Sequence, residues 1–314
     1  MHRSMLQQLM KTYKDPKVDI QKSPDIHFEG EMAADPGGPT KEYFYSAMKS
    51  LFNVDPIFGV SLFTGERGHY VPVMNMDAIS SGCFKMVGKP LAHSVLHGGP
   101  GLPGLAPAVR KYLVSGSVID AADLVSVEDI PDIDLPDLIE NKVCDLCYYY
   151  HGYLKFILFI YLFCPLTGDK SVTLLTEEEK DKIEEAMVRH GCTDIPLSDK
   201  KMVKSVQDVM VGEVLVSRVT ALDAIFWGMN TIQLGQLLRA KPTVSQHVFP
   251  SPDQVLVDVE TLKNKMTIGV LEKVDDEKKK NAYDWFLRFT SEYKEPRGWC
   301  FCRQCICFEA ILIF

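Results

Sequence analysis

The sequence predicts a mostly helical α+β fold with a few short strands, and three observations lead to this prediction. Apolar side chains recur at helical spacing in several long segments. Short alternating runs such as "GHYVPVMNM" are typical of a hairpin. Of the 314 residues, 46% are hydrophobic and 24% are charged. The chain is therefore globular, with enough residues for one large or two ordinary domains.

The N-terminal elements come first. Residues 1–22 predict an amphipathic helix followed by a charged linker, and the residues just before Asp35 resemble a short strand. The run Pro36-Gly37-Gly38-Pro39 predicts a tight turn. Thr40 is then expected to cap the next helix, because its hydroxyl can accept an N–H of the first turn. The apolar stripe of that helix consists of Tyr43, Phe44, Ala47, Met48, Leu51 and Phe52.

The middle of the chain is richer in turns. Residues 58–76 predict a hairpin, and "HGGPGLPGLAPAVRKYLV" (97–114) predicts a loop that leads into a helix. The acidic segment 126–139 is broken by prolines and predicts a loop with one helical turn.

The last third is predicted to be helical. In 176–191, Thr176 and Glu179 have the spacing of a capping box, and Gly191 follows the last turn. Further helices are predicted at 198–218, at 220–240 before Lys241-Pro242, and at 278–293. No internal repeat is present.

Composition limits the partners. A net charge of -8 argues against a nucleic-acid partner, because phosphate binding requires clustered Lys and Arg. The Gly-rich pieces "DPGGPT" and "HGGPGLPG" match neither the phosphate loop nor the dinucleotide fingerprint, so no cofactor is expected. The N-terminus has no secretory-signal pattern, and nine scattered cysteines indicate reduced thiols. A cytoplasmic or nuclear location is therefore expected.

An apolar segment at 148–166 allows three interpretations. Its uninterrupted apolar run covers nine residues, from Phe156 to Cys164, whereas a bilayer requires roughly 20. A buried helix or strand is therefore favoured, and a membrane is not an expected partner. A membrane-tethered protein remains an alternative, and so does a segment that is foreign to the surrounding fold.

Histidine and cysteine positions were considered as metal or acid–base sites. The candidates are His27, Asp35, His69, His93 and His97, of which only His93 and His97 have the i, i+4 spacing of a helical zinc site. They have no third ligand nearby, so a packed helix end is favoured. The cysteines of "CDLC" (144–147) and "CFCRQCIC" (300–307) lie far apart among aromatic residues. No metal site is therefore expected.

The segment "FEGEMAADPGGPTKEYF" resembles a hallmark of HECT-type ubiquitin-protein ligases. Lys41 stands where that family usually has Arg, and Ala33 where Gly is common. Segments 97–114, 221–249 and 285–292 resemble, in the same order, the branch that contains the G2/M-phase-specific ligase. The residues that match the first motif are Phe28, Gly30, Glu31, Asp35, Gly37, Gly38, Glu42, Tyr43 and Phe44.

The resemblance implies an enzyme of two lobes. The N-terminal lobe docks a ubiquitin-conjugating enzyme, and a cysteine of the C-terminal lobe accepts ubiquitin as a thioester before a lysine of the protein substrate attacks it. Residues 1–294 would form the N-terminal lobe, and 295–314 a cysteine-rich tail outside it. The family's Leu-Pro-x-x-x-Thr-Cys-Phe context occurs at none of the tail's cysteines, which are Cys300, Cys302, Cys305 and Cys307.

No residue is therefore assigned as catalytic, and the chain by itself is expected to be inactive, with the catalytic lobe absent. The segments 141–166 and 295–314 depart from the family, which suggests translated non-coding or mis-spliced sequence. A non-catalytic binding module for a conjugating enzyme or a substrate is the alternative. Its surface would lie within 112–190, where four residues are candidate exposed contacts, although packing in the core is favoured for them because large apolar residues are usually buried: Tyr112, Leu113, Leu135 and Leu138.

Overall fold

The computed structural model describes residues 4–28, 37–55, 61–132, 134–139, 176–191 and 202–251, and helices dominate these ranges. The strands in them form one antiparallel pair, β1 (Phe63–Thr64) and β2 (Val71–Pro72). Phe63 lies opposite Pro72, and Thr64 lies opposite Val71. The mostly helical α+β prediction is confirmed, and so is the hairpin within 58–76, although its strands are short.

Of the two N-terminal helices, the first agrees with its prediction and the second differs at its start. Helix α1 (Met5–Lys14) begins after Ser4, whose Oγ accepts the Gln7 N–H at 3.2 Å, and the predicted linker follows it. Helix α2 (Gly37–Ser50) already contains Thr40, whose Oγ1 donates to the Pro24 carbonyl at 3.4 Å. The predicted turn over 37–39 and the Thr40 cap are therefore wrong. Pro39 fits the first helical turn because N–H groups there have no intrahelical acceptor.

The middle of the chain forms short helices around one long one. These are α3 (Met76–Ser80), α4 (Cys83–Leu96), α5 (Pro107–Ser115) and α6 (Val118–Ala122). Helix α5 begins with proline and ends at Gly116, which has φ 72°. The predicted loop and helix at 97–114 are thus confirmed. The single helical turn expected within 126–139 is α7 (Leu135–Leu138), and a 3₁₀ turn, η1 (Val127–Asp129), precedes it.

The later helices follow one another closely. Helix α10 (Glu177–Arg189) is followed by Gly191 with φ 77°, as predicted. The Thr176–Glu179 capping box stays a prediction, because the Glu179 side chain lies outside the described part. Then come α11 (Met202–Val214), η3 (Val216–Arg218), α12 (Val219–Met229), η4 (Asn230–Ile232), α13 (Leu234–Ala240), η5 (Pro242–Val244) and α14 (Ser245–Val248).

The single helix predicted over 220–240 is in fact divided. Gln233 has φ 62° and interrupts the helix between η4 and α13. The predicted end before Lys241-Pro242 is confirmed, because α13 stops at Ala240. The predicted helix at 278–293, the segment 141–166 and the tail 295–314 lie outside the described residues. None of the helices in the described part is long and apolar enough to cross a membrane, and the segment 148–166 remains untested.

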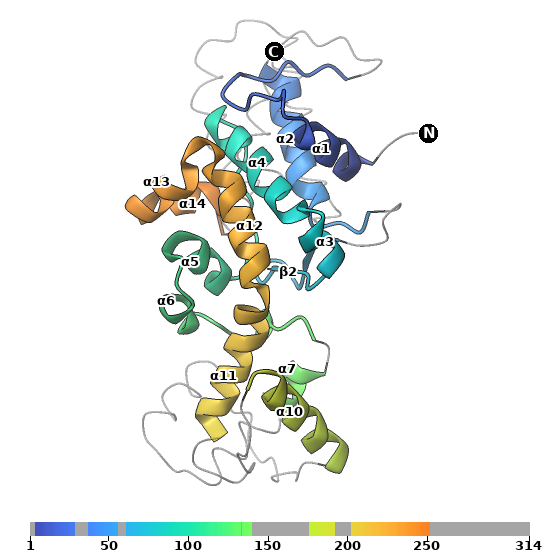
Figure 1. The fold of residues 1–314 in the computed structure, drawn as a ribbon, viewed down its shortest axis with the longest axis vertical. Coiled ribbons are helices and arrows are strands. Elements are labelled where there is room, and N and C mark those ends of the chain that lie inside the picture. The colour runs from blue at the N-terminus through green and yellow to red at the C-terminus, as the bar shows by residue number, and fades with distance from the viewer. Residues whose placement is uncertain are drawn as a thin grey trace, which may run out of the picture.

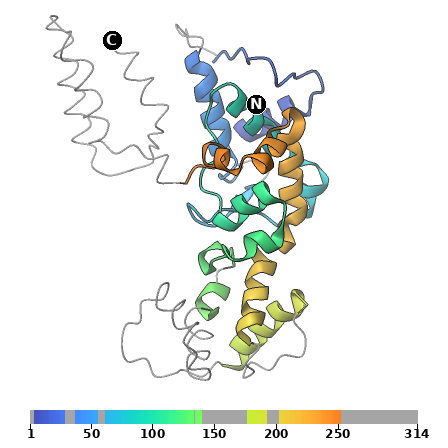
Figure 2. The same cartoon turned by 90° about the vertical axis from the view of Figure 1, so that its left-hand side faces the viewer.

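The described part is elongated, with α11, η3 and α12 following its long axis (Figures 1 and 2). Helices α1, α2, α4, α5, α12 and α13 surround the main hydrophobic core, which we call the upper body. Helices α7, α10 and the first part of α11 form a smaller group at the other end, which we call the lower lobe. The linker containing η1 and the α11–α12 connection both join the two regions.

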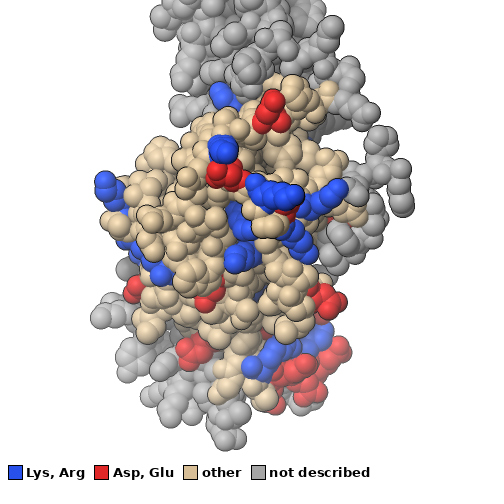
Figure 3. All heavy atoms as spheres, turned by 45° about the horizontal axis from the view of Figure 1, so that its top comes forward, with Lys and Arg blue, Asp and Glu red and all other residues tan. Residues whose placement is uncertain are grey.

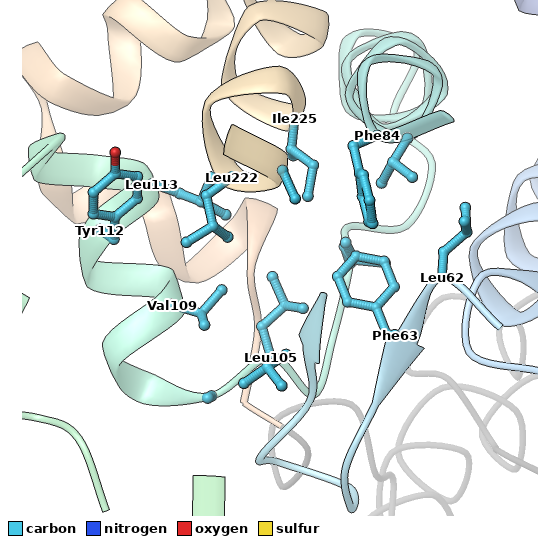
Figure 4. Packing of buried hydrophobic residues seen from close by; sticks show 14 of the residues in the cluster. Leu62, Phe63, Phe84, Leu105, Val109, Tyr112, Leu113, Leu222 and Ile225 are labelled. Carbon is cyan, nitrogen blue, oxygen red and sulfur yellow. The ribbon is translucent and has the colours of Figure 1, made fainter. Parts of the chain in front are cut away.

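The core of the upper body forms where α4 and α12 cross. Glycines let the two backbones touch: a Cβ on Gly88 would lie 2.8 Å from the Gly228 Cα and would overlap the Ile225 carbonyl oxygen. Figure 4 shows Phe63 of β1 pointing toward Phe84 of α4, with Ile225 of α12 beside them. All three side chains are at most 1% exposed. This crossing fixes the position of every element that contacts α4 or α12.

Candidate functional site

The residues of the N-terminal motif lie on and before α2. Phe44 is fully buried, Glu42 is exposed, and Phe28 is half-buried. Gly37 and Gly38 form the start of the helix. Tyr43, beside Phe44 on the helix, is half-buried, and Gly30, Glu31 and Asp35 lie outside the described residues. Helix α2 therefore presents one aromatic anchor of the motif to the core and one carboxylate to the surface.

Phe44 packs against the end of α4. Its ring meets the His93 imidazole edge to face, with the ring centroids 5.2 Å apart. A Cβ on Gly99 would lie 3.2 Å from the Phe44 ring and within 3.1 Å of the Ser94 carbonyl oxygen. The motif helix and the Gly-rich loop after residue 97 are thus brought together in space. The spacing of their residues in the sequence gives no sign of this contact.

His93 is a buried, neutral histidine whose tautomer follows from its partners. Its Nε2 lies 3.0 Å from the Lys22 carbonyl oxygen, which can only accept, so Nε2 carries the proton. Nδ1 then accepts from the Tyr13 hydroxyl at 2.8 Å. His97 Nε2 lies 3.3 Å from the Ile20 carbonyl and donates in the same way. The packed helix end expected for this pair is confirmed.

The burial of His93 predicts acid sensitivity. Desolvation lowers its pKa below the ordinary value, so the unfolded chain binds a proton first as the pH falls. We expect the free energy of unfolding to decrease as the pH drops below about 6.5, the pKa of an unperturbed histidine. The total loss is about 1.4 kcal/mol for each unit by which the pKa of His93 in the folded chain lies below its value in the unfolded chain. Urea unfolding at pH 7.5, 6.5 and 5.5 measures this, and His93→Gln should flatten the dependence. An equal pH slope in the two proteins would contradict the prediction.

A second histidine has a carboxylate partner that local spacing did not reveal. His69, in the turn between β1 and β2, places Nδ1 2.7 Å from Oδ1 of Asp129, which is fully buried. The other carboxylate oxygen accepts the Ser126 N–H at 3.0 Å. Burial raises the pKa of the Asp129 carboxyl, opposed by these hydrogen bonds. The signal that could have located Asp129 is the Ser-x-x-Asp spacing of a capping box, seen at η1.

The His69–Asp129 pair can serve two purposes. A buried carboxylate that orients an imidazole is the base–orienter half of many acid–base sites. It also ties the hairpin of the upper body to the linker that leads to α7. The guanidinium of Arg110 on α5 is the nearby cation, and burial lowers its pKa while Asp129 raises it. With these contacts alone, the pair acts as a structural connection between the hairpin and the linker.

The four candidate contact residues are core residues. Tyr112 and Leu113 are 5% and 1% exposed, and Leu135 and Leu138 are 5% and 8% exposed. In Figure 4, Leu113 points toward Leu222 of α12. The Tyr112 hydroxyl donates to Asp223 Oδ1 at 2.9 Å, and burial raises the Tyr112 pKa to about 12. The exposure that a contact role requires is absent, because large apolar side chains gain more by packing on their own helices.

A buried carboxylate near the end of α11 holds helix α10 of the lower lobe in place. Glu213 of α11 accepts from Arg189 Nη1 at 2.6 Å, and its Oε1 lies 3.0 Å from His190 Nε2. The His190 ring lies directly against Gly212, where any Cβ would overlap it. The end of α10 is thereby fixed to α11.

Arg218 makes the corresponding connection to the upper body. This 4% exposed side chain donates from Nε to the Pro72 carbonyl of β2 at 2.8 Å. Desolvation lowers its pKa to about 10, so it stays charged at neutral pH. Sequence reasoning singled out neither Glu213 nor Arg218, because a charge within a helical segment is usually a solvated one.

The outward face of α10 is the exposed surface of the lower lobe. Ile183, Ala186 and Met187 are buried beneath it. Exposed carboxylates on this face include Glu178, Asp181, Glu184 and Glu185. Val188 stands among them with 61% of its surface exposed. Val188 is thus an exposed apolar side chain surrounded by carboxylates on the described face of α10.

The histidines and cysteines of the described ranges have other neighbours. No group of three or more His, Cys, Asp or Glu there is placed to hold a metal ion. His27 pairs instead with Asp25 at 3.0 Å in an exposed position. Cys83, which is free, contacts the Ser81 hydroxyl at 3.1 Å. The cysteines at 144–147 and 300–307 lie outside the described residues.

Comparison with protein-family models, with curated proteins and with solved structures gives no match for this chain.

Proposed function

We propose that this chain is a docking module of the HECT-ligase kind, which binds a ubiquitin-conjugating enzyme on its lower lobe. One observation carries the proposal: three separate segments that resemble the family pack into one helical body, from which a smaller lobe extends (Figure 1). Phe44 of α2 meets His93 and Gly99. The Leu102 N–H donates to the Val248 carbonyl at 2.8 Å, which joins the Gly-rich loop to α14.

Docking without transfer is the expected activity. None of the cysteines in the sequence has the context of the family's thioester cysteine. Ubiquitin would therefore reach the chain only as the cargo of the conjugating enzyme, and a protein substrate would not be modified by this chain alone. The exposed face of α10 is the surface that we assign to docking, because Val188 offers an apolar contact inside a charged rim.

The test is binding and transfer measured together. The purified chain is titrated against a panel of ubiquitin-conjugating enzymes, and the same mixtures with charged ubiquitin are run on non-reducing gels. We expect a dissociation constant in the micromolar range for at least one enzyme and no ubiquitin adduct. Val188→Asp should weaken binding by about tenfold, or about 1.4 kcal/mol. Met76→Asp is the matched control, since Met76 is 75% exposed at the start of α3, which packs on α4 and lies outside 112–190.

Two results would contradict the proposal. Absence of binding across the whole panel, with a folded protein, would remove the docking role. A ubiquitin adduct that is sensitive to reducing agent would remove the non-catalytic part. If that adduct persists after Cys300, Cys302, Cys305 and Cys307 are changed to Ser, the nucleophile lies elsewhere in the chain.

A further inference from the structure

Four lysines gather where the last turn of α1 meets the first half of α4. The Lys89 Nζ donates to the Tyr13 carbonyl at 3.0 Å, which places the lysines of α4 beside the end of α1. Lys85 lies one turn before Lys89, on the same face of α4. We call this group the α1–α4 lysine surface, and its members are Lys11, Lys14, Lys85 and Lys89. Figure 3 shows several Lys and Arg side chains close together on one face of the molecule, with a few Asp and Glu side chains beside them.

The positive charge of this surface is not neutralised within the described residues. None of its four lysines forms an ion pair there with a carboxylate. Of the carboxylates that follow α1, Asp19 pairs with Lys22, whereas Asp15 accepts the Lys17 N–H at 2.9 Å and keeps its charge, so four lysines face one carboxylate that is unpaired in the described part. Desolvation and the charge of Lys85 both lower the pKa of Lys89. A local excess of positive charge thus stands on a chain whose net charge is -8.

Helix stabilisation explains only part of this arrangement. Lysines in the last turn of α1 interact favourably with the helix dipole, and Lys89 satisfies a carbonyl at the end of α1. Lys85 has no such favourable interaction with a helix dipole, because it lies in the first turn of α4, at the positive end of the helix. Its charge also repels that of Lys89. Like charges four residues apart in a helix are destabilising. An external anion would offset this repulsion.

We propose that the α1–α4 lysine surface binds an acidic segment of a partner protein. A membrane surface would require apolar side chains to insert beside the lysines. No exposed large apolar residue lies on the described α1, and the one on α4, Leu96, is at the far end from Lys85. Met74 and Met76, which are 58% and 75% exposed, precede and begin α3, and two methionines fall short of the apolar face that an interfacial helix inserts. Single-stranded nucleic acid would require exposed aromatic rings for stacking, whereas Tyr13 and Phe84 on these helices are buried. Carboxylates on a flexible polypeptide need only the lysines.

The experiment uses the full chain and a fluorescent 12-residue peptide with alternating Glu and Ser. Fluorescence anisotropy should show binding at about 20 mM salt that weakens several-fold at about 150 mM, as expected for exposed charges. The double variant Lys11→Ala/Lys85→Ala should lower the affinity by at least about fivefold. Lys111→Ala/Lys241→Ala removes two exposed lysines from α5 and the end of α13 and should change the affinity less than about twofold. Both double variants have the same net charge, so only the position of the charges differs.

Three results would overturn the proposal. The first is no binding of the peptide by the folded wild-type chain. The second is an equal loss of affinity in the two double variants, since binding would then follow net charge alone. The third is tighter binding of phosphatidylserine-containing vesicles, or of a single-stranded oligonucleotide, than of the peptide. Circular dichroism of each variant confirms that a change in affinity reflects the surface and not unfolding. The proposal does not depend on docking at α10, and Val188→Asp should leave peptide binding unchanged.

Discussion

Replacing Gly228 with alanine should destabilise the protein by about 3 kcal/mol, the upper range for adding a methyl group to a packed core. The Cβ would overlap the Lys85 carbonyl oxygen and lie 2.8 Å from the Gly88 Cα. Both neighbours are backbone atoms of α4, so relief requires the two helices to move apart. Because α4 and α12 hold the centre of the upper body, the whole core would be affected. Urea or thermal unfolding measures the loss.

Two other glycine substitutions provide graded controls for Gly228→Ala. A Cβ on Gly235 would meet the Phe226 ring at 2.7 Å, and a side chain can shift where backbone cannot. Gly235→Ala should therefore cost less than Gly228→Ala. Gly82 has φ 75° and open space around it, so Gly82→Ala should cost about 1 kcal/mol through backbone strain alone. Equal losses of stability on Gly228→Ala and Gly82→Ala would show that α4 and α12 pack less closely than described.

Glu213→Ala should cost about 2 to 3 kcal/mol and loosen the lower lobe specifically. The substitution leaves the guanidinium of Arg189 and the nearby imidazole of His190 without their buried carboxylate. Arg189 is about half exposed, which lowers the cost below that of a fully buried pair. Relative to the wild-type chain, the variant should show a larger increase in amide hydrogen exchange in α10 than in α4. Chemical denaturation gives the size of the effect.

Glu185→Ala is the matched control for Glu213→Ala. Glu185 also contacts Arg189, at 3.4 Å, but its side chain is 74% exposed. Exposed pairs one helical turn apart contribute about 0.3 to 0.5 kcal/mol. If Glu185→Ala and Glu213→Ala destabilise equally, burial does not determine the strength of this cluster. If neither alters exchange in α10, the cluster does not hold the lower lobe to α11.

Elements with strong local signals were predicted well. Helix α10 has an acidic first turn and a glycine after its end, and α5 has Pro107 at its start and Gly116 after it. These signals act within a few residues, because they concern N–H and C=O groups without intrahelical partners. Helix α4 shows the opposite case. It contains Gly88 and Pro90, only its end near His93 and His97 was expected to be helical, and it forms because its apolar side chains pack at the centre of the core.

The candidate site depends on contacts between residues that are distant in the chain. His69 meets Asp129 sixty positions later, and Arg218 reaches the Pro72 carbonyl across 146 positions. The sequence singled out His69 without its partner, and gave no sign of Arg218. For Tyr112 and Leu138 core packing was favoured over exposed contact, but an apolar side chain on one face of a helix does not show what covers that face. Only their burial decides between the two.

The sequence by itself determined that this protein is mostly helical, and it located the ends of two helices, before Gly191 and before Lys241. Hydrophobic periodicity and backbone preferences are local properties, so they can be evaluated without a structure. The tertiary structure decided which helices cross, which charges are buried and which lysines lie together. Those outcomes depend on close packing and on the removal of water between segments far apart in the chain, which no local pattern of residues encodes.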